Sequence, residues 1–63
     1  MYLVFYSTSN VFKAEEILET SNIECKIVPT PVKDKAYCGV CVQTDSLEAT
    51  KLCNEMEHEV IEE

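Results

Sequence analysis

A length of 63 residues allows one small domain, which we expect to span residues 1–63, and a hydrophobic content of 46% argues against a disordered chain. The 12 acidic and 5 basic side chains give a formal net charge of −7. This acidity argues against a nucleic acid or an anionic membrane surface as the partner, because either would require a basic face.

The first third of the chain predicts a strand followed by an amphipathic helix. Residues 2–6 form a short run of aromatic and branched side chains, which is typical of a central strand. Residues 7–10 are helix-capping types, and residues 11–21 carry apolar side chains at helical spacing. The apolar stripe consists of Val11, Ala14 and Leu18, with Ile17 beside it. Asn22 can adopt the left-handed conformation that closes a helix.

Two further strands are predicted, separated by a long loop. Residues 23–28 alternate, with Ile23, Cys25 and Ile27 on one side. Pro29 and Pro31 end this strand, because proline cannot donate to a strand ladder. Residues 39–44 alternate again, with Val40 and Val42 facing one way and Cys41 and Gln43 the other.

The last part of the chain predicts a second helix and a final short strand. Asp45 and Glu48 have the spacing of a capping box. The helix they open would carry Ala49, Leu52, Cys53 and Met56 on one stripe, and residues 58–62 could form the final strand. The order β-α-β-β-α-β predicts an α+β domain of the ferredoxin-like, split βαβ type, with two helices on one face of a small antiparallel sheet.

Four cysteines are an unusual number for a chain of this length: Cys25, Cys38, Cys41 and Cys53. No stretch approaches the ~20 apolar residues of a membrane span, and the start at Met1 is not typical of a signal peptide, so we expect a cytoplasmic protein. Because cytoplasmic thiols are kept reduced, these cysteines are core residues, metal ligands or reactive thiols rather than disulfide partners. Cys25 and Cys53 fall on apolar stripes, which favours a structural role.

Cys38 is the candidate reactive residue. It lies at the far end of the long loop between the two middle strands, and long loops often carry function. Gly39 would leave room for a second molecule to approach the sulfur. Lys33 and Lys35 lie in the same loop, and a nearby cation favours the thiolate, the form that attacks a disulfide, a persulfide or an electrophile.

Other interpretations of these cysteines stay open. Cys38 and Cys41 form a C-x-x-C, which would be a redox pair if the two thiols approach each other, although no helix follows it as in thioredoxin-like proteins. A zinc site would draw on both with Cys25, Cys53 or His58, but only one ligand pair has the required spacing. We therefore expect no metal and no cofactor. A non-catalytic interaction module with structural cysteines is the main alternative function.

Pro29-x-Pro31 followed by Cys38-Gly39 at the start of an apolar strand resembles a family of small bacterial domains described as selenium/sulfur carrier protein-like. The resemblance covers nearly the whole chain, through Ser7-Thr8, Lys13-Ala14-Glu15, Ile23, Val28-Pro29 and the final helix. The family tends to have hydroxylated residues just before Cys-Gly and a basic residue after the second proline. This chain has Lys35-Ala36-Tyr37 and Val32 at those positions.

The resemblance implies that Cys38 accepts sulfur or selenium as a persulfide or selenosulfide and passes it on. A cysteine desulfurase-like donor and an acceptor protein would be the partners, and Cys41 would be able to resolve the persulfide as an internal disulfide. On this interpretation the protein is a carrier or a binding protein rather than an autonomous enzyme. Its small size also makes a homodimer plausible.

Overall fold

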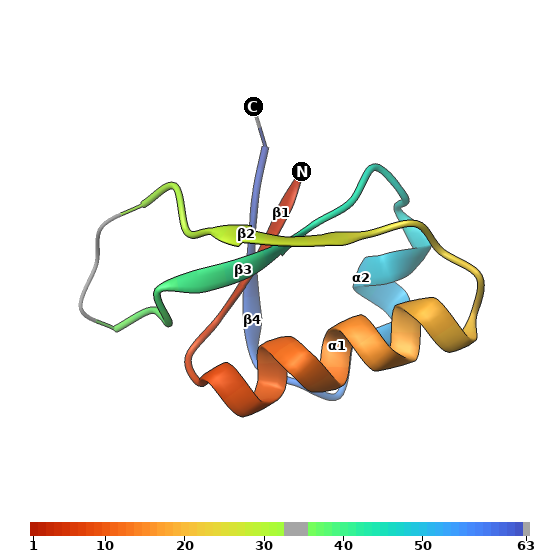
Figure 1. The fold of residues 1–63 in the computed structure, drawn as a ribbon, viewed down its shortest axis with the longest axis horizontal. Coiled ribbons are helices and arrows are strands. Elements are labelled where there is room, and N and C mark those ends of the chain that lie inside the picture. Colours follow the sequence, from red (N-terminus) through yellow and green to blue (C-terminus); the bar gives the residue numbers. More distant parts are fainter. Residues whose placement is uncertain (33–35, 63) are drawn as a thin grey trace.

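The computed structural model describes residues 1–32 and 36–62. Its elements in chain order are β1 (Tyr2–Phe5), α1 (Thr8–Thr20), β2 (Lys26–Pro29), β3 (Val40–Gln43), α2 (Glu48–Leu52) and β4 (His58–Ile61), as labelled in Figure 1. The strands form one antiparallel sheet in the order β2-β3-β1-β4. Each helix therefore connects two strands that are separated by a third. The predicted α+β architecture with a small antiparallel sheet is confirmed.

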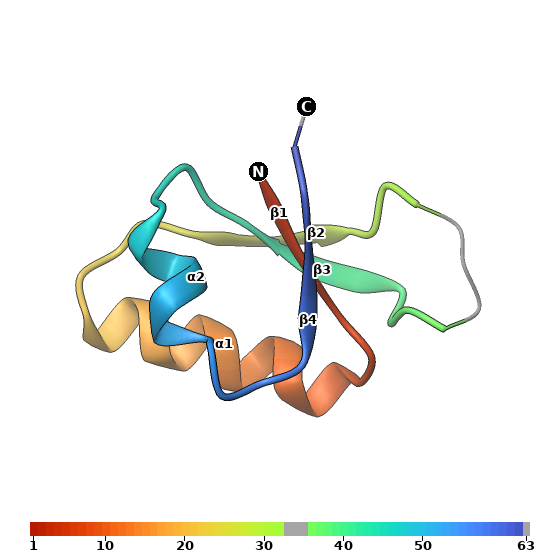
Figure 2. The same cartoon turned by 180° about the vertical axis from the view of Figure 1, so that it is seen from behind.

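Both helices pack on the same face of the sheet. Leu3, Phe5 and Val42 share that face, because Leu3 and Phe5 are two residues apart and Leu3 pairs with Val42 across the β1–β3 ladder. They form one buried cluster with residues of α1 and of the α2 region: Val11, Ala14, Leu18, Ala49 and Cys53. The view from behind in Figure 2 shows α2 lying against α1 in this layer. The predicted stripe of the first helix and the predicted Ala49 and Cys53 thus contribute to the core. The second helix is shorter than predicted: α2 ends at Leu52, which is 40% exposed, and Met56 lies beyond it.

The centre of the opposite sheet face is buried as well. Val4 and Cys41 alternate with the core residues of β1 and β3, so they point away from the helices, yet both are fully buried. The thiol of Cys41 donates a weak hydrogen bond to the carbonyl of Pro29 at 3.8 Å. Cys41 is therefore an interior residue of the sheet.

Helix α1 begins at Thr8, three residues before the predicted apolar stripe. Ser7 is the N-cap, and its hydroxyl accepts a hydrogen bond from the N–H of Asn10 at 3.3 Å. At the other end, Asn22 has a φ of 61°, the left-handed conformation expected of a residue that ends a helix. Both capping predictions for this helix are confirmed.

Replacing Ser7 by alanine is expected to lower the free energy of unfolding by about 1 kcal/mol, because one N–H of the first turn then loses its acceptor. In a domain of this size that corresponds to a fall in Tm of roughly 4–8 °C, measurable by thermal unfolding. Ser9→Ala is the matched control, since Ser9 lies exposed within α1 and caps nothing. An equal loss in both variants would contradict the capping role.

Two predicted boundaries are wrong for local reasons. The segment 23–25 precedes β2 instead of forming its first part, and there the Glu24 carbonyl accepts a bond from the Thr44 hydroxyl at 3.0 Å. The capping box of Asp45 and Glu48 does not form, because the N-cap position of α2 is Leu47 and no side chain caps it. The Glu48 N–H instead donates to the Ser46 hydroxyl at 3.3 Å.

None of the helices in the described residues is long and apolar enough to cross a membrane. The start of β1 and the end of β4 lie side by side in both views (Figures 1 and 2), since Tyr2 pairs with Ile61. The N-terminal ammonium of Met1 donates to the carbonyl of Thr44 at 3.0 Å, beyond the end of β3.

Candidate functional site

The backbone at Cys38 is held from two sides just before β3 begins. Its N–H donates to the carbonyl of Phe5, at the end of β1, at 2.9 Å. Its own carbonyl accepts a bond from the Thr30 hydroxyl at 2.7 Å, and the Thr30 N–H donates to the carbonyl of Gly39 at 3.0 Å. These bonds fix the loop end between β1 and the residue that follows β2.

The sulfur of Cys38 lies at the start of α1. The hydroxyl of Thr8, the first residue of that helix, is 3.1 Å from Cys38 Sγ. This hydrogen bond is the main cause of a lowered pKa for the Cys38 thiol, followed by bonds from the backbone N–H groups of Val40 and Gly39, with slight burial opposing them. Each of these donors stabilises the ionised sulfur, so the site favours a thiolate.

No helix follows the C-x-x-C pattern in the sequence, but in the structure the N-terminus of α1 lies next to Cys38 Sγ. A helix N-terminus carries partial positive charge and exposed N–H groups, which favour a nearby anion. In thioredoxin-like motifs the cysteine itself opens the helix. Here the contact at Thr8 brings the N-terminus of a helix 30 residues earlier to the thiol.

Gly39, the residue after Cys38, is exposed. No atom outside its chain neighbours lies within 4 Å of the position that a Cβ would take, and its φ is not positive. The residue is therefore not required here by backbone conformation. The access role predicted for Gly39 stays a prediction.

The other three cysteines differ from Cys38 in the direction of their pKa shifts. All four are free; Cys38 and Cys25 are both half-buried and pack against the core, whereas Cys41 and Cys53 are fully buried. Burial is the first cause of a raised pKa at each of these three, and the charge of Cys38 raises the pKa of Cys41 further. Among the four thiols, only Cys38 has a lowered pKa.

The sequence pointed to Cys38 but not to its hydroxyl partner. Lys33 and Lys35, the predicted source of thiolate stabilisation, lie outside the described residues. In the sequence, Thr8 belongs to the capping cluster at residues 7–10 and to the segments that carry the family resemblance, but neither pattern predicts a contact with Cys38. The available signal was topological: if β1 and β3 pair antiparallel, the residues that follow β1 meet the residues that precede β3.

The described residues offer no metal site. No group of three or more histidine, cysteine or acidic side chains among them is arranged to hold an ion. His58, a ligand considered for zinc, has Nδ1 within 2.8 Å of the Met56 carbonyl, and its ring packs on Phe5 with centroids 5.6 Å apart.

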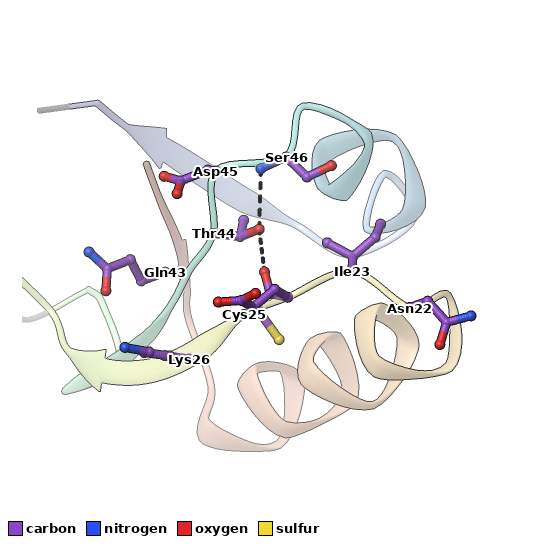
Figure 3. A pocket seen from close by; sticks show the side chains of 9 residues that line it. Asn22, Ile23, Cys25, Lys26, Gln43, Thr44, Asp45 and Ser46 are labelled. Carbon is purple, nitrogen blue, oxygen red and sulfur yellow. Dashed lines mark hydrogen bonds between the residues drawn. The ribbon is translucent and has the colours of Figure 1, made fainter.

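A cavity of about 610 Å³ lies at the other end of β3, away from Cys38 (Figure 3). The Thr44 hydroxyl at its centre is already used, donating to the Glu24 carbonyl and accepting from the Ser46 N–H. The thiol in the cavity lining is that of Cys25, and burial, followed by the charges of Glu15 and Glu19, raises its pKa. The lining carries no activated group, so Cys38 remains the candidate site. The cavity is lined by Asn22, Ile23, Glu24, Cys25, Lys26, Gln43, Thr44, Asp45 and Ser46.

The fold and the site together define a small α+β domain with one half-buried thiol of lowered pKa at a loop end, next to the N-terminus of α1. The chain belongs to the family described as "Putative Se/S carrier protein-like", which matches residues 1–63, the whole of this sequence. No curated protein and no solved structure matches the chain.

Proposed function

We propose that this protein carries sulfur or selenium on Cys38 as a persulfide or selenosulfide and transfers it to a partner protein. The observation that carries the proposal is the contact of Cys38 Sγ with the Thr8 hydroxyl, which lowers the pKa of this thiol while the pKa values of the other three are raised. Membership of the Se/S carrier-like family supports it independently.

Loading is a thiol exchange at the terminal sulfur of a donor persulfide. The Cys38 thiolate attacks that sulfur, a new S–S bond forms, the donor's S–S bond breaks, and its electron pair leaves on the donor cysteine. In unloading, a thiolate of the acceptor attacks the outer sulfur, and Cys38 departs as the thiolate. The donors at Thr8, Gly39 and Val40 assist this second step, because a stabilised thiolate is a better leaving group.

Cys41 would compete with the acceptor if it acts as a resolving thiol. Attack of Cys41 on the inner sulfur would form a Cys38–Cys41 disulfide and release hydrosulfide. The burial of Cys41 and its raised pKa disfavour this attack in the folded chain. We therefore assign Cys38 the carrier role and treat Cys41 as a resolving thiol only when the site opens.

The partners in this proposal are a cysteine desulfurase-like donor and a biosynthetic acceptor protein, in the cytoplasm. No autonomous catalysis is required of the domain. It needs only to present one thiolate, and the substrate-binding pockets would belong to the larger partners. Lys33 and Lys35 are proposed to add positive charge near the thiolate.

The test is sulfur loading by a desulfurase. The protein is incubated with a cysteine desulfurase and cysteine, and its intact mass is measured without reductant. We expect an adduct of one sulfur atom on the wild type and on Cys25→Ser, the matched thiol control, and none on Cys38→Ser. An adduct that survives Cys38→Ser would refute the assignment. If Cys38→Ser also leaves cellular phenotype and partner binding unchanged, the non-catalytic interaction module is favoured instead.

A further inference from the structure

Two tyrosine rings pack on each other in a tilted pair between the residue before Cys38 and strand β4. The ring of Tyr37, the residue before Cys38, lies against the ring of Tyr6 with centroids 5.5 Å apart and an interplanar angle of 35°. Tyr6 is 40% exposed, and its hydroxyl donates to Glu59 Oε1 at 3.4 Å. The residue before Cys38 is therefore joined through two aromatic rings to a carboxylate of β4.

The Tyr6 end of this pair is acidic. Glu57 and Glu59 are both exposed, and the Glu59 carboxylate accepts the bond from the Tyr6 hydroxyl. Burial is the first cause of a raised pKa for Tyr6, followed by the charges of Glu59, Tyr37 and Glu57. The net charge of −7 adds a negative field around the molecule. Tyr6, Tyr37, Glu57 and Glu59 are called the aromatic–acidic surface below.

We propose that the aromatic–acidic surface docks a partner protein that presents an arginine or lysine beside its own reactive sulfur. This inference rests on the proposed carrier function and specifies the chemistry of the partner. A cationic side chain is attracted to the face of a tyrosine ring and to a carboxylate, and a guanidinium can do both at once. Such contacts steer the encounter and orient the partner's sulfur toward Cys38.

The surface suits a transient contact. Exposed charge pairs and exposed cation–π contacts are individually weak. A carrier must release each partner after transfer, so an interaction dominated by steering serves it better than a large apolar interface. The complementary field raises the association rate more than the lifetime of the complex.

The experiment uses three short peptides that differ only in the residues flanking one cysteine, which are arginine, serine or glutamate. Each cysteine is activated as a 2-pyridyl disulfide. The Cys38 thiolate attacks the peptide sulfur, the peptide–pyridine S–S bond breaks, and pyridine-2-thione departs and is followed by its absorbance. We expect the arginine peptide to react about tenfold faster than the glutamate peptide at low ionic strength.

Ionic strength and matched variants separate the surface from net charge alone. The preference should shrink as salt approaches 1 M, where the Debye length falls to about 3 Å. Glu57→Gln/Glu59→Gln should lose most of the preference. Glu24→Gln/Asp45→Asn removes the same charge at the cavity beyond the far end of β3, and it should keep most of the preference. Tyr6→Leu should also reduce the preference for the arginine peptide, because it removes the ring that a cation would contact.

Three outcomes would overturn the proposal: equal rates for the three peptides, equal effects of the two double variants, or a preference for the glutamate peptide. If a preference for the glutamate peptide is lost in Lys33→Gln/Lys35→Gln, the loop lysines would select an acidic partner instead.

The peptide assay and the sulfur-loading assay test different proposals, because peptide exchange needs only a thiolate at Cys38. A sulfur adduct with no peptide preference would therefore reject the surface alone, and a peptide preference with no adduct would reject the carrier function alone.

Discussion

Iodoacetamide at neutral pH is expected to alkylate Cys38 in the folded protein while the other three cysteines remain unmodified. The reactive form is the thiolate, and Cys38 alone among the four has a lowered pKa. Cys41 and Cys53 are fully buried and react only when the structure opens. An opening free energy of a few kcal/mol slows their modification on the order of 100-fold or more.

The pH dependence of this alkylation tests its cause. The rate at Cys38 should rise with pH and level off above its pKa, with an inflection below that of an ordinary cysteine, because ionisation is easier here. Thr8→Val removes the hydroxyl and keeps the shape of the side chain, so its inflection should move to higher pH. Thr8→Ser restores a hydroxyl and should restore the wild-type profile.

Peptide mapping after a timed pulse of reagent gives the modified residue directly. Protein unfolded in denaturant is the reference, in which all four thiols should react at similar rates. An unchanged inflection in Thr8→Val would show that the hydroxyl does not stabilise the thiolate. A first modification at Cys25 would contradict the assignment of Cys38 as the reactive thiol.

Much of the fold follows from local patterns. The spacing of Val11, Ala14 and Leu18 predicts the buried face of α1, and the capping types at residues 7–10 and Asn22 indicate where it begins and ends. The alternation of Val40 and Val42 predicts the sheet face that carries the core. Such signals are readable because each depends on residues a few positions apart and on one periodicity.

The chemistry of the site depends on a contact that no local pattern contains. Cys38 and Thr8 are 30 residues apart, and their contact requires that β1 and β3 pair and that α1 starts immediately after β1. The sequence places the lysines of the loop beside Cys38, which is why a charge-based explanation arises first. A neutral hydroxyl and two backbone N–H groups provide the stabilisation found in the described residues.

The hydroxyl at Thr8 also bears on the departure from the family pattern. The family tends to carry hydroxylated residues just before Cys-Gly, where this chain has Lys35-Ala36-Tyr37. A hydroxyl reaches the sulfur here from a different element, the first turn of α1.

Replacing Phe5 by alanine is expected to unfold most of the protein at room temperature. Phe5 is fully buried between the sheet and the helices, and a Phe→Ala change in a core costs about 3–5 kcal/mol. A chain of 63 residues has a total stability of only about 3–9 kcal/mol. In a urea titration, the variant should lack the folded baseline and the cooperative transition that the wild type shows.

Phe12→Ala is the matched control, because it makes the same chemical change on the exposed side of α1, where Phe12 is 53% exposed. Its effect should stay within about 0.5 kcal/mol. The carbonyl of Phe5 also accepts the N–H of Cys38, so the strand that anchors the core also fixes the reactive loop. As Phe5→Ala unfolds the chain, Cys41 and Cys53 should become reactive together with Cys38, whereas Phe12→Ala should keep alkylation confined to Cys38. Retained selectivity in an unfolded Phe5→Ala variant would mean that the low pKa of Cys38 arises from its neighbours in sequence rather than from the fold.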